Sequence, residues 1–124
     1  MMRLLDTNSC IYVFTGVYPA LIARMADQVA GSLFISSITY AELAYGTMRG
    51  NPPASDALAA FVAEVGVLPF DEAAAQAYAA MPFRRGSFDR LIAAHALSLD
   101  AALVSRNLAD FKDIPGLRVE DWTH

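Results

Sequence analysis

Four acidic side chains in this 124-residue chain stand where apolar runs end or where helices are expected to begin: Asp6, Glu42, Asp89 and Asp110. Asp6 directly follows Leu4-Leu5, and Asp110 comes shortly after the run Leu103-Val104. Ligands of open parallel sheets bind at the edge where the strands end. If the apolar runs form such a sheet, all four carboxylates are expected to converge on that edge.

Clustered carboxylates repel one another and raise each other's pKa, and a hard divalent cation removes that cost. Mg²⁺ prefers oxygen ligands and keeps several waters, and a bound metal can orient a phosphate and activate water. Neighbouring hydroxyls and amides would hold the carboxylates and the waters, and the candidates for this role are Thr7, Asn8, Ser105 and Asn107. The pattern therefore predicts a divalent-metal site.

Each acidic residue also has a simpler interpretation. Asp6 could begin a turn, Glu42 could belong to a capping box, and Asp89 could be a favourable charge at a helix N-terminus. Asp110 could be an ordinary surface charge, with Asp113 as a nearby competitor for its role. The sequence has no Ser–His–Asp order, glycine-rich phosphate loop or zinc spacing, and His95 is expected to pack against a neighbour rather than to catalyse.

The net charge limits which kinds of binding partner are expected. A formal net charge of −4 argues against a broad basic nucleic-acid surface, although an acidic metal site accounts for part of that deficit. Eight of the nine basic residues are Arg, which can grip phosphate with two parallel hydrogen bonds. Arg84, Arg85 and Arg106 flank the acidic residues and are candidates for guiding a polyanion to them; the alternative is a solvated charged rim.

Hydropathy and cysteine content indicate the cellular compartment and whether a partner covers part of the surface. Cys10 is the only cysteine, which fits a reducing cytoplasm, and it is expected in the core. No apolar run approaches the ~18 residues of a membrane span, and no signal peptide is visible. Mean hydropathy is nevertheless high, at +0.35. We therefore expect an apolar surface covered by a partner, mainly on the helices over 8–14, 21–29 and 38–48.

The elements that would position these residues alternate along the chain. Short strands are expected at 2–6, 32–36, 67–70, 102–105 and 117–119. Helices are expected to follow, with Asn8 or Ser9 capping the first and Asp71 and Ser87 capping two later ones. The helix carrying Glu42 is expected to begin at Thr39 in a capping box, or at Ser36 or Ser37. This alternation predicts one α/β domain over 1–124, a mostly parallel sheet of four to five short strands with helices on both faces.

The motifs, taken in order, resemble a known family. Leu4-Leu5-Asp6-Thr7-Asn8 resembles the opening of PIN-domain ribonucleases, and the block from Ser36 to Leu43 resembles the second block of their VapC toxin branch. The block from Phe88 to Ala96 resembles the third, and Leu103 to Asn107 with Asp110-Phe111 resembles the fourth. Together these blocks span nearly the whole chain in the family's order.

The resemblance implies a PIN-like three-layer α/β/α fold and an Mg²⁺- or Mn²⁺-dependent endoribonuclease that cleaves RNA with metal-activated water. The acidic positions Asp6, Glu42, Asp89 and Asp110 match the family's, with Asp6 and Asp89 the best candidates for direct metal contact. It further implies a homodimer and a cognate antitoxin protein, in a heterotetramer or a larger complex that reaches DNA only through the antitoxin. One departure is the segment from Tyr78 to Asp89, which is shorter than the family pattern.

Other functions compete with this one. A PIN-fold module without catalysis could act in an antitoxin-bound DNA repressor complex, although the complete acidic set favours an enzyme. A phosphoacceptor receiver domain would need paired acids after the first strand and a lysine after a late one, and Lys112 is poorly placed for that role. A dehalogenase-type phosphatase would need a second Asp where Asn8 stands.

Overall fold

Five parallel strands form the centre of the molecule. The structure, a computed structural model, describes residues 1–84 and 88–124. The strands are β1 Arg3–Leu5, β2 Leu33–Ser36, β3 Gly66–Leu68, β4 Ala102–Val104 and β5 Val119–Glu120, in the spatial order β3-β2-β1-β4-β5. This parallel sheet confirms the predicted fold class, and β3 and β5 lie at its edges.

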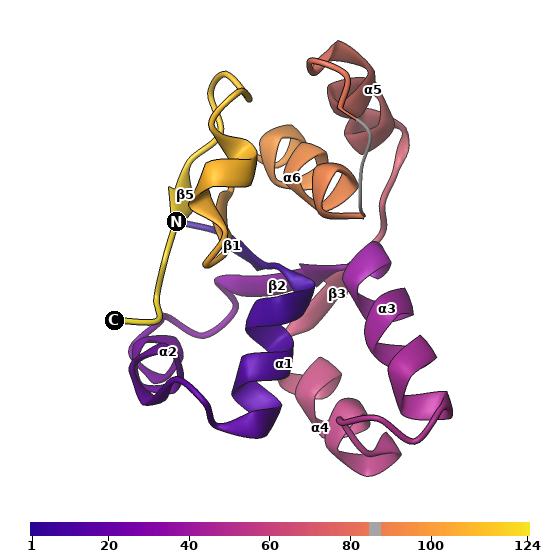
Figure 1. Cartoon of the computed structure of the whole chain (residues 1–124), viewed down its shortest axis with the longest axis vertical. Coiled ribbons are helices and arrows are strands. Elements are labelled where there is room, and N and C mark those ends of the chain that lie inside the picture. The colour runs from indigo at the N-terminus through magenta and orange to yellow at the C-terminus, as the bar shows by residue number, and fades with distance from the viewer. Residues whose placement is uncertain (85–87) are drawn as a thin grey trace.

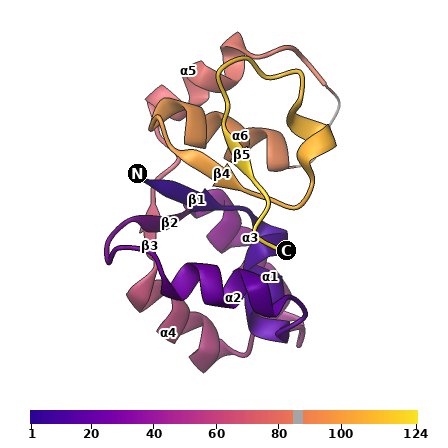
Figure 2. The same ribbon diagram turned by 90° about the vertical axis from the view of Figure 1, so that its left-hand side faces the viewer.

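Helices cover both faces of this sheet, as Figures 1 and 2 show. They are α1 Thr7–Thr15, α2 Pro19–Ala26, α3 Ser37–Met48, α4 Ser55–Glu64, α5 Glu72–Ala80 and α6 Asp89–Ser98, with a short 3₁₀ helix, η1, at Leu108–Phe111. α5 and α6 lie on one face, and α1, α2 and α4 lie on the other.

Alternation along the central strand β1 creates the two cores. Leu4 packs on one face of the sheet with Ile92 of α6, whereas Leu5 packs on the opposite face with Cys10 of α1 and Leu43 of α3. All of these side chains are at most 2% exposed. Successive side chains of a strand point to opposite faces, so a strand that is apolar at both positions must be covered on both sides.

The helix starts differ in part from the sequence predictions. Asp6, rather than Asn8 or Ser9, caps α1, because its carboxylate accepts the backbone N–H of Ser9. Ser36 caps α3 through the N–H of Ile38, which selects one of the predicted alternatives. Asp71 caps α5 as predicted, whereas the predicted cap Ser87 of α6 lies outside the described residues.

The second helix also begins earlier than predicted, at Pro19, and it ends at Ala26. Proline is favoured in the first turn of a helix, where its missing N–H has no intrahelical acceptor to lose. Within the described residues, no single helix is long and apolar enough to cross a membrane; α1 and α2 reach that length only together, and they are bent by 103°.

Candidate active site at the carboxyl edge of the sheet

The carboxyl ends of β1, β2 and β4 bring the predicted residues to one edge of the sheet. Asp6 follows β1, α3 with Glu42 follows β2, and Ser105 follows β4. α6 leads into β4 and therefore runs back along the sheet, which places Asp89, in its first turn, toward the same edge. The topology thus delivers all four acidic residues to this edge.

Three elements hold Asp6 in place. Its backbone N–H donates to the carbonyl oxygen of Val104 in β4 over 3.1 Å. Its Oδ1 accepts the N–H of Ser9 over 2.8 Å, and the Ser9 hydroxyl donates in turn to the same Val104 carbonyl. Asp6 is 3% exposed. A carboxylate is seldom so buried without a partner, and here part of its hydrogen-bonding capacity is met by the start of α1.

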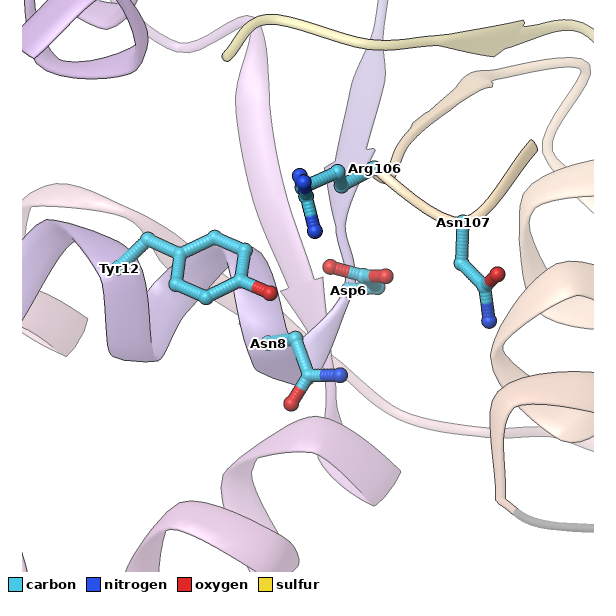
Figure 3. Close-up of a pocket in the computed structure, with 5 residues that line it drawn as sticks. All are labelled: Asp6, Asn8, Tyr12, Arg106 and Asn107. Atoms are coloured by element: carbon cyan, nitrogen blue, oxygen red, sulfur yellow. The ribbon is translucent and has the colours of Figure 1, made fainter. Parts of the chain in front are cut away.

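A small polar cavity of about 140 Å³ opens beside Asp6. It is lined by Asp6, Asn8, Tyr12, Arg106 and Asn107. Figure 3 shows the Asp6 carboxylate between the side chains of Arg106, Asn8 and Asn107, with the Tyr12 hydroxyl directed toward them. The cavity therefore combines one acidic group, two amides and one guanidinium, a set suited to holding a charged oxygen-rich ligand.

Thr7 joins Glu42 to the Asp6 segment. The Thr7 Oγ1 lies 2.5 Å from Glu42 Oε1 and 3.3 Å from Thr39 Oγ1. A hydroxyl has a single proton, so Thr7 donates it to the carboxylate, which is both closer and charged. Glu42 lies in α3, which follows β2, whereas Asp6 follows β1. The Thr7 hydroxyl therefore links the Glu42 side chain to the residue next to Asp6.

On the β4 side, Asn107 links Asp110 to the cavity. The Asn107 side-chain amide donates to Asp110 Oδ2, and its backbone N–H donates to Ser105 Oγ over 3.0 Å. Asn107 lines the cavity beside Asp6, so Asp110 lies one side chain away from it. Asp110 is exposed.

The competing acid Asp113 is engaged elsewhere. Arg90, which is 6% exposed, donates to both Asp113 oxygens over 2.9 Å, and the hydrogen bond holds the pKa of Asp113 down at about 2. Asp113 therefore forms a structural ion pair, and Asp110 is the better candidate for the site.

Within 1–84 and 88–124, the structure holds no group of three His, Cys, Asp or Glu side chains that could bind a metal ion. Asp6, Glu42 and Asp110 are linked through Thr7 and Asn107 rather than through direct contact. The donors at this edge are nonetheless oxygen atoms, the ligands that Mg²⁺ prefers, and they fit a hard cation that keeps part of its water shell.

The arginines that the sequence offered as guides for a polyanion differ in their surroundings. Arg106 lines the cavity with Asp6. Arg84 is half exposed and lies 3.4 Å from Asp113, and Arg85 lies outside the described residues. Of the two described candidates, Arg106 is the one that lines the cavity of a candidate catalytic carboxylate, whereas Arg84 contacts Asp113.

Tyr12 is the cavity residue that sequence reasoning missed. Its spacing from Asn8 is a signal that could have found it, because residues four apart share one face of a helix. Tyr12 also meets Tyr18 edge-on, with ring centroids 4.8 Å apart, and the Arg106 guanidinium lies 5.4 Å from the Tyr18 ring centroid.

Two further reactive side chains lie in the core. His95 is 1% exposed and packs edge-on against Phe70, with ring centroids 5.6 Å apart, as the packing interpretation predicted. Cys10 is fully buried, and burial raises the pKa of its thiol well above the usual value.

Comparison with known proteins agrees with this fold. Residues 3–117 match the PIN domain family. A tRNA(fMet)-specific endonuclease VapC of Shigella flexneri is 36% identical, with 97% of each chain covered. The structure of VapBC-1 from nontypeable Haemophilus influenzae superposes with a TM-score of 0.83 at 31% identity, over 100% of both chains.

A DNA-bound VapBC structure from Salmonella typhimurium superposes with a TM-score of 0.82 at 32% identity, over 98% of both chains. The chain belongs to the PIN domain family, in its VapC branch.

Proposed function

We propose that this chain is a metal-dependent endoribonuclease and the toxin of a toxin–antitoxin pair. The observation that carries the proposal is the Asp6 cavity, in which a carboxylate held by β1, α1 and β4 lies beside two amides and a guanidinium. The relatives support the reaction class, because full-length similarity extends to proteins named as a tRNA(fMet)-specific endonuclease and as a ribonuclease.

Asp6 and Asp89 would hold a divalent cation directly, and Glu42 and Asp110 would contribute through bound water. Such a cation, Mg²⁺ or Mn²⁺, supplies charge neutralisation at the phosphate and activation of the attacking water. The chain's own groups do the positioning: Thr7 orients Glu42, and Asn107 orients Asp110. The amide of Asn8 borders the same cavity and would help to orient the waters there.

RNA would reach this edge with help from arginine, because the net charge of −4 opposes the approach of a polyanion. Arg106 and Arg84 are exposed and could contact RNA phosphates, and Arg85 adjoins Arg84 in sequence. Removing these charges should weaken RNA binding and flatten its salt dependence. An unchanged salt slope in a triple Ala variant would mean that these residues serve only solubility.

The direct test is cleavage of purified RNA by the partner-free protein with Mg²⁺ or Mn²⁺. One relative's name makes initiator tRNA the first substrate to try. We expect cleavage by the natural chain, and none by Asp6→Asn or in excess chelator. Absence of cleavage of tRNA and of total cellular RNA with either metal would overturn the assignment.

We also propose an antitoxin partner that acts with this chain in the cytoplasm. An apolar cavity of about 380 Å³ on α3, lined by Ile38, Ala41, Glu42, Tyr45 and Phe88, would take an apolar partner helix. Tyr45 is 61% exposed and Met48 on the same helix is 84% exposed, which is costly on an uncovered surface. Glu42 lines this groove and is also one of the candidate catalytic residues, so a partner helix bound in the groove could block the access of RNA.

Co-purification with the protein encoded alongside it tests this partner. Tyr45→Ser should weaken inhibition by that protein, whereas Val29→Ser, at a 79% exposed position on the α2–β2 connection, should not. A homodimer is expected as well, and light scattering that finds a monodisperse monomer at high concentration would refute it. Relatives crystallised as DNA-bound VapBC complexes favour a second role in repression, in which DNA contact would come through the antitoxin.

A further inference from the structure

We propose that Arg106 binds the reacting phosphate of the RNA and that Tyr18 is the residue that positions it. This inference deepens the proposed function and rests on it. It assigns one phosphate contact at the catalytic edge to one side chain and separates Arg106 from the other arginines, which would serve at most as general attractants.

Arg106 stands at the mouth of the cavity that holds Asp6. It directly follows Ser105 at the carboxyl end of β4, and its side chain is exposed. Figure 3 shows the guanidinium projecting to the side of the Asp6 carboxylate, between that group and Tyr12. Any phosphate oxygen that approaches Asp6 and Asn107 through this cavity therefore comes within reach of Arg106.

The neighbouring aromatic rings limit where that guanidinium can lie. Its Cζ is 5.4 Å from the centroid of the Tyr18 ring, within the range of a cation–π contact. Tyr18 is itself braced edge-on by Tyr12 at 4.8 Å. Contact with an aromatic face leaves the N–H groups at the edge of the guanidinium plane available, and those are the donors that form paired bonds to a phosphate.

The other arginines of the described chain are committed to different contacts. Arg90 and Arg84 pair with Asp113, Arg118 pairs with Asp100, and Arg3 pairs with Glu120. The remaining two described arginines form no ion pair but have other contacts: Arg24 lies over the Trp122 ring, and Arg49 lies over the Tyr45 ring and donates to the Tyr45 carbonyl oxygen. Within the same described residues, Arg106 forms no ion pair with a carboxylate, although it borders Asp6 in the cavity. A cation in this position is therefore available for a ligand anion.

The chemistry of the reaction explains the value of such a group. Phosphodiester cleavage places an additional oxygen on phosphorus and increases the charge that the site must stabilise. A preorganised donor aimed at the developing charge accelerates such a step, and removing one such donor costs about 10²–10³-fold in rate. Arg106 would supply this from the side opposite Asn107, in a cavity whose other charged side chain is an acid.

Substitutions at Arg106 test the assignment directly. We expect Arg106→Ala to lower kcat about 100-fold with a smaller change in KM. Arg106→Lys should recover only part of the rate, because an ammonium cannot reproduce the paired geometry. Added guanidinium ion should partly restore Arg106→Ala and leave Arg106→Lys unchanged. Arg118→Ala is the matched control, since it removes an equal charge that is paired with Asp100, before β5.

The supporting role of Tyr18 has its own signature. Tyr18→Phe keeps the aromatic face and should behave like the natural chain, whereas Tyr18→Leu should lower kcat about tenfold.

RNA binding in excess chelator, where no cleavage occurs, tests Arg106 separately. Arg106→Ala should reduce the slope of log affinity for single-stranded RNA against log salt by about 0.7, the value expected for one phosphate contact. Unfolding in urea should be unchanged in the Arg106 variants because the side chain is exposed.

The outcomes separate this inference from the proposed function. If the natural chain cleaves RNA and Arg106→Ala cleaves as fast as Arg118→Ala, the assignment of Arg106 is wrong and the proposed function stands. If the natural chain cleaves nothing, the proposed function fails. The chelator binding experiment then decides for Arg106 on its own: a salt slope equal to that of the natural chain overturns the assignment, and a reduced slope supports the contact.

Discussion

The guanidinium of Arg90 and the carboxylate of Asp113 face each other in a two-pronged ion pair, with both N–O distances at 2.9 Å. Arg90 is buried, and it also donates to the carbonyl oxygens of Pro82 and Asp110. One side chain thereby fastens the segment before α6 to the loop after η1. Arg90 adjoins Asp89 in the first turn of α6, so these contacts tie that turn to Pro82 and to Asp113.

Removing Arg90 should destabilise the fold more than removing Asp113. Arg90→Ala leaves the carbonyl oxygens of Pro82 and Asp110 without this donor and leaves Asp113 with the longer 3.4 Å contact from Arg84, so we expect a loss on the order of 2–3 kcal/mol in the free energy of unfolding. Asp113→Asn retains a side chain that can still accept hydrogen bonds, so its loss should be smaller. Urea unfolding measures both, and an Arg90→Ala chain as stable as the natural one would contradict the structural role.

The same pair has a defined pH dependence. The pKa of Asp113 falls to about 2 in the folded chain, below the usual value of 3.8, chiefly because of the hydrogen bond from Arg90. As pH falls, the Asp113 carboxylate is protonated at a higher pH in the unfolded chain than in the folded chain. The contribution of the ion pair to the free energy of unfolding is therefore complete above pH 3.8 and is lost as pH falls toward 2. The stability difference between the natural chain and Asp113→Asn should shrink over that interval, and a constant difference would argue against the pair.

Asp6 both caps α1 and lies in the candidate catalytic cavity, and two substitutions separate these roles. Asp6→Asn keeps an oxygen for the Ser9 N–H, so we expect a folded but inactive protein with apo stability that is unchanged or higher. Asp6→Ala should be inactive and also about 1 kcal/mol less stable through loss of the cap. RNA cleavage assays with Mn²⁺ measure the loss of activity, and urea unfolding measures the change in stability. Cleavage by Asp6→Asn at the natural rate would sink the catalytic assignment.

The acidic residues should not contribute equally. Asp110 is exposed and reaches the cavity through Asn107, whereas Asp6 lines it directly. We therefore expect a larger loss of cleavage from Asp6→Asn than from Asp110→Asn. Asp100→Asn is a suitable control, because Asp100 has φ of 52° and Asn tolerates that region. If Asp110→Asn were as active as this control, the fourth acidic role would belong to another residue.

His95 should make stability sensitive to mild acid. Burial lowers the pKa of its imidazole, and its Nδ1 has no hydrogen-bond partner within the described residues. The unfolded chain thus takes up the proton more readily, so stability is complete above pH 6.5 and declines as pH falls below that value. A His95→Leu variant should lack that part of the decline between pH 7.5 and 5. Equal urea-midpoint shifts for the two proteins over this range would refute the prediction.

Much of the fold could be predicted because its strands are apolar runs bounded by turn residues. Leu4-Leu5 and Leu103-Val104 are apolar at consecutive positions, and strands covered on both faces require that pattern. The prediction was wrong at the start of the second helix, which was expected over 21–29 although α2 begins at Pro19. Proline ends a helix from within and favours its first turn, so the residue type alone does not decide between the two.

The candidate site could be predicted only in part, because its decisive contacts join distant positions. The sequence favoured Asp110 but left Asp113 as a nearby competitor, and the contact that separates them comes from Arg90, which is 23 positions from Asp113. Likewise, the contact of Arg106 with Tyr18 depends on β4 lying beside β1, a pairing that residue spacing does not encode. Periodicity identifies buried faces, but it does not identify which side chain meets which across the sheet.

The position of β1 between β2 and β4 has a consequence for how the protein is made. Asp6 is synthesised well before Val104, yet its backbone N–H donates to the Val104 carbonyl, and its cavity is completed by Arg106 and Asn107. A growing chain that has not yet reached β4 lacks these groups. We therefore expect nascent chains to be harmless to the RNA of the ribosome that makes them, with the site assembled only once β4 has emerged and docked beside β1.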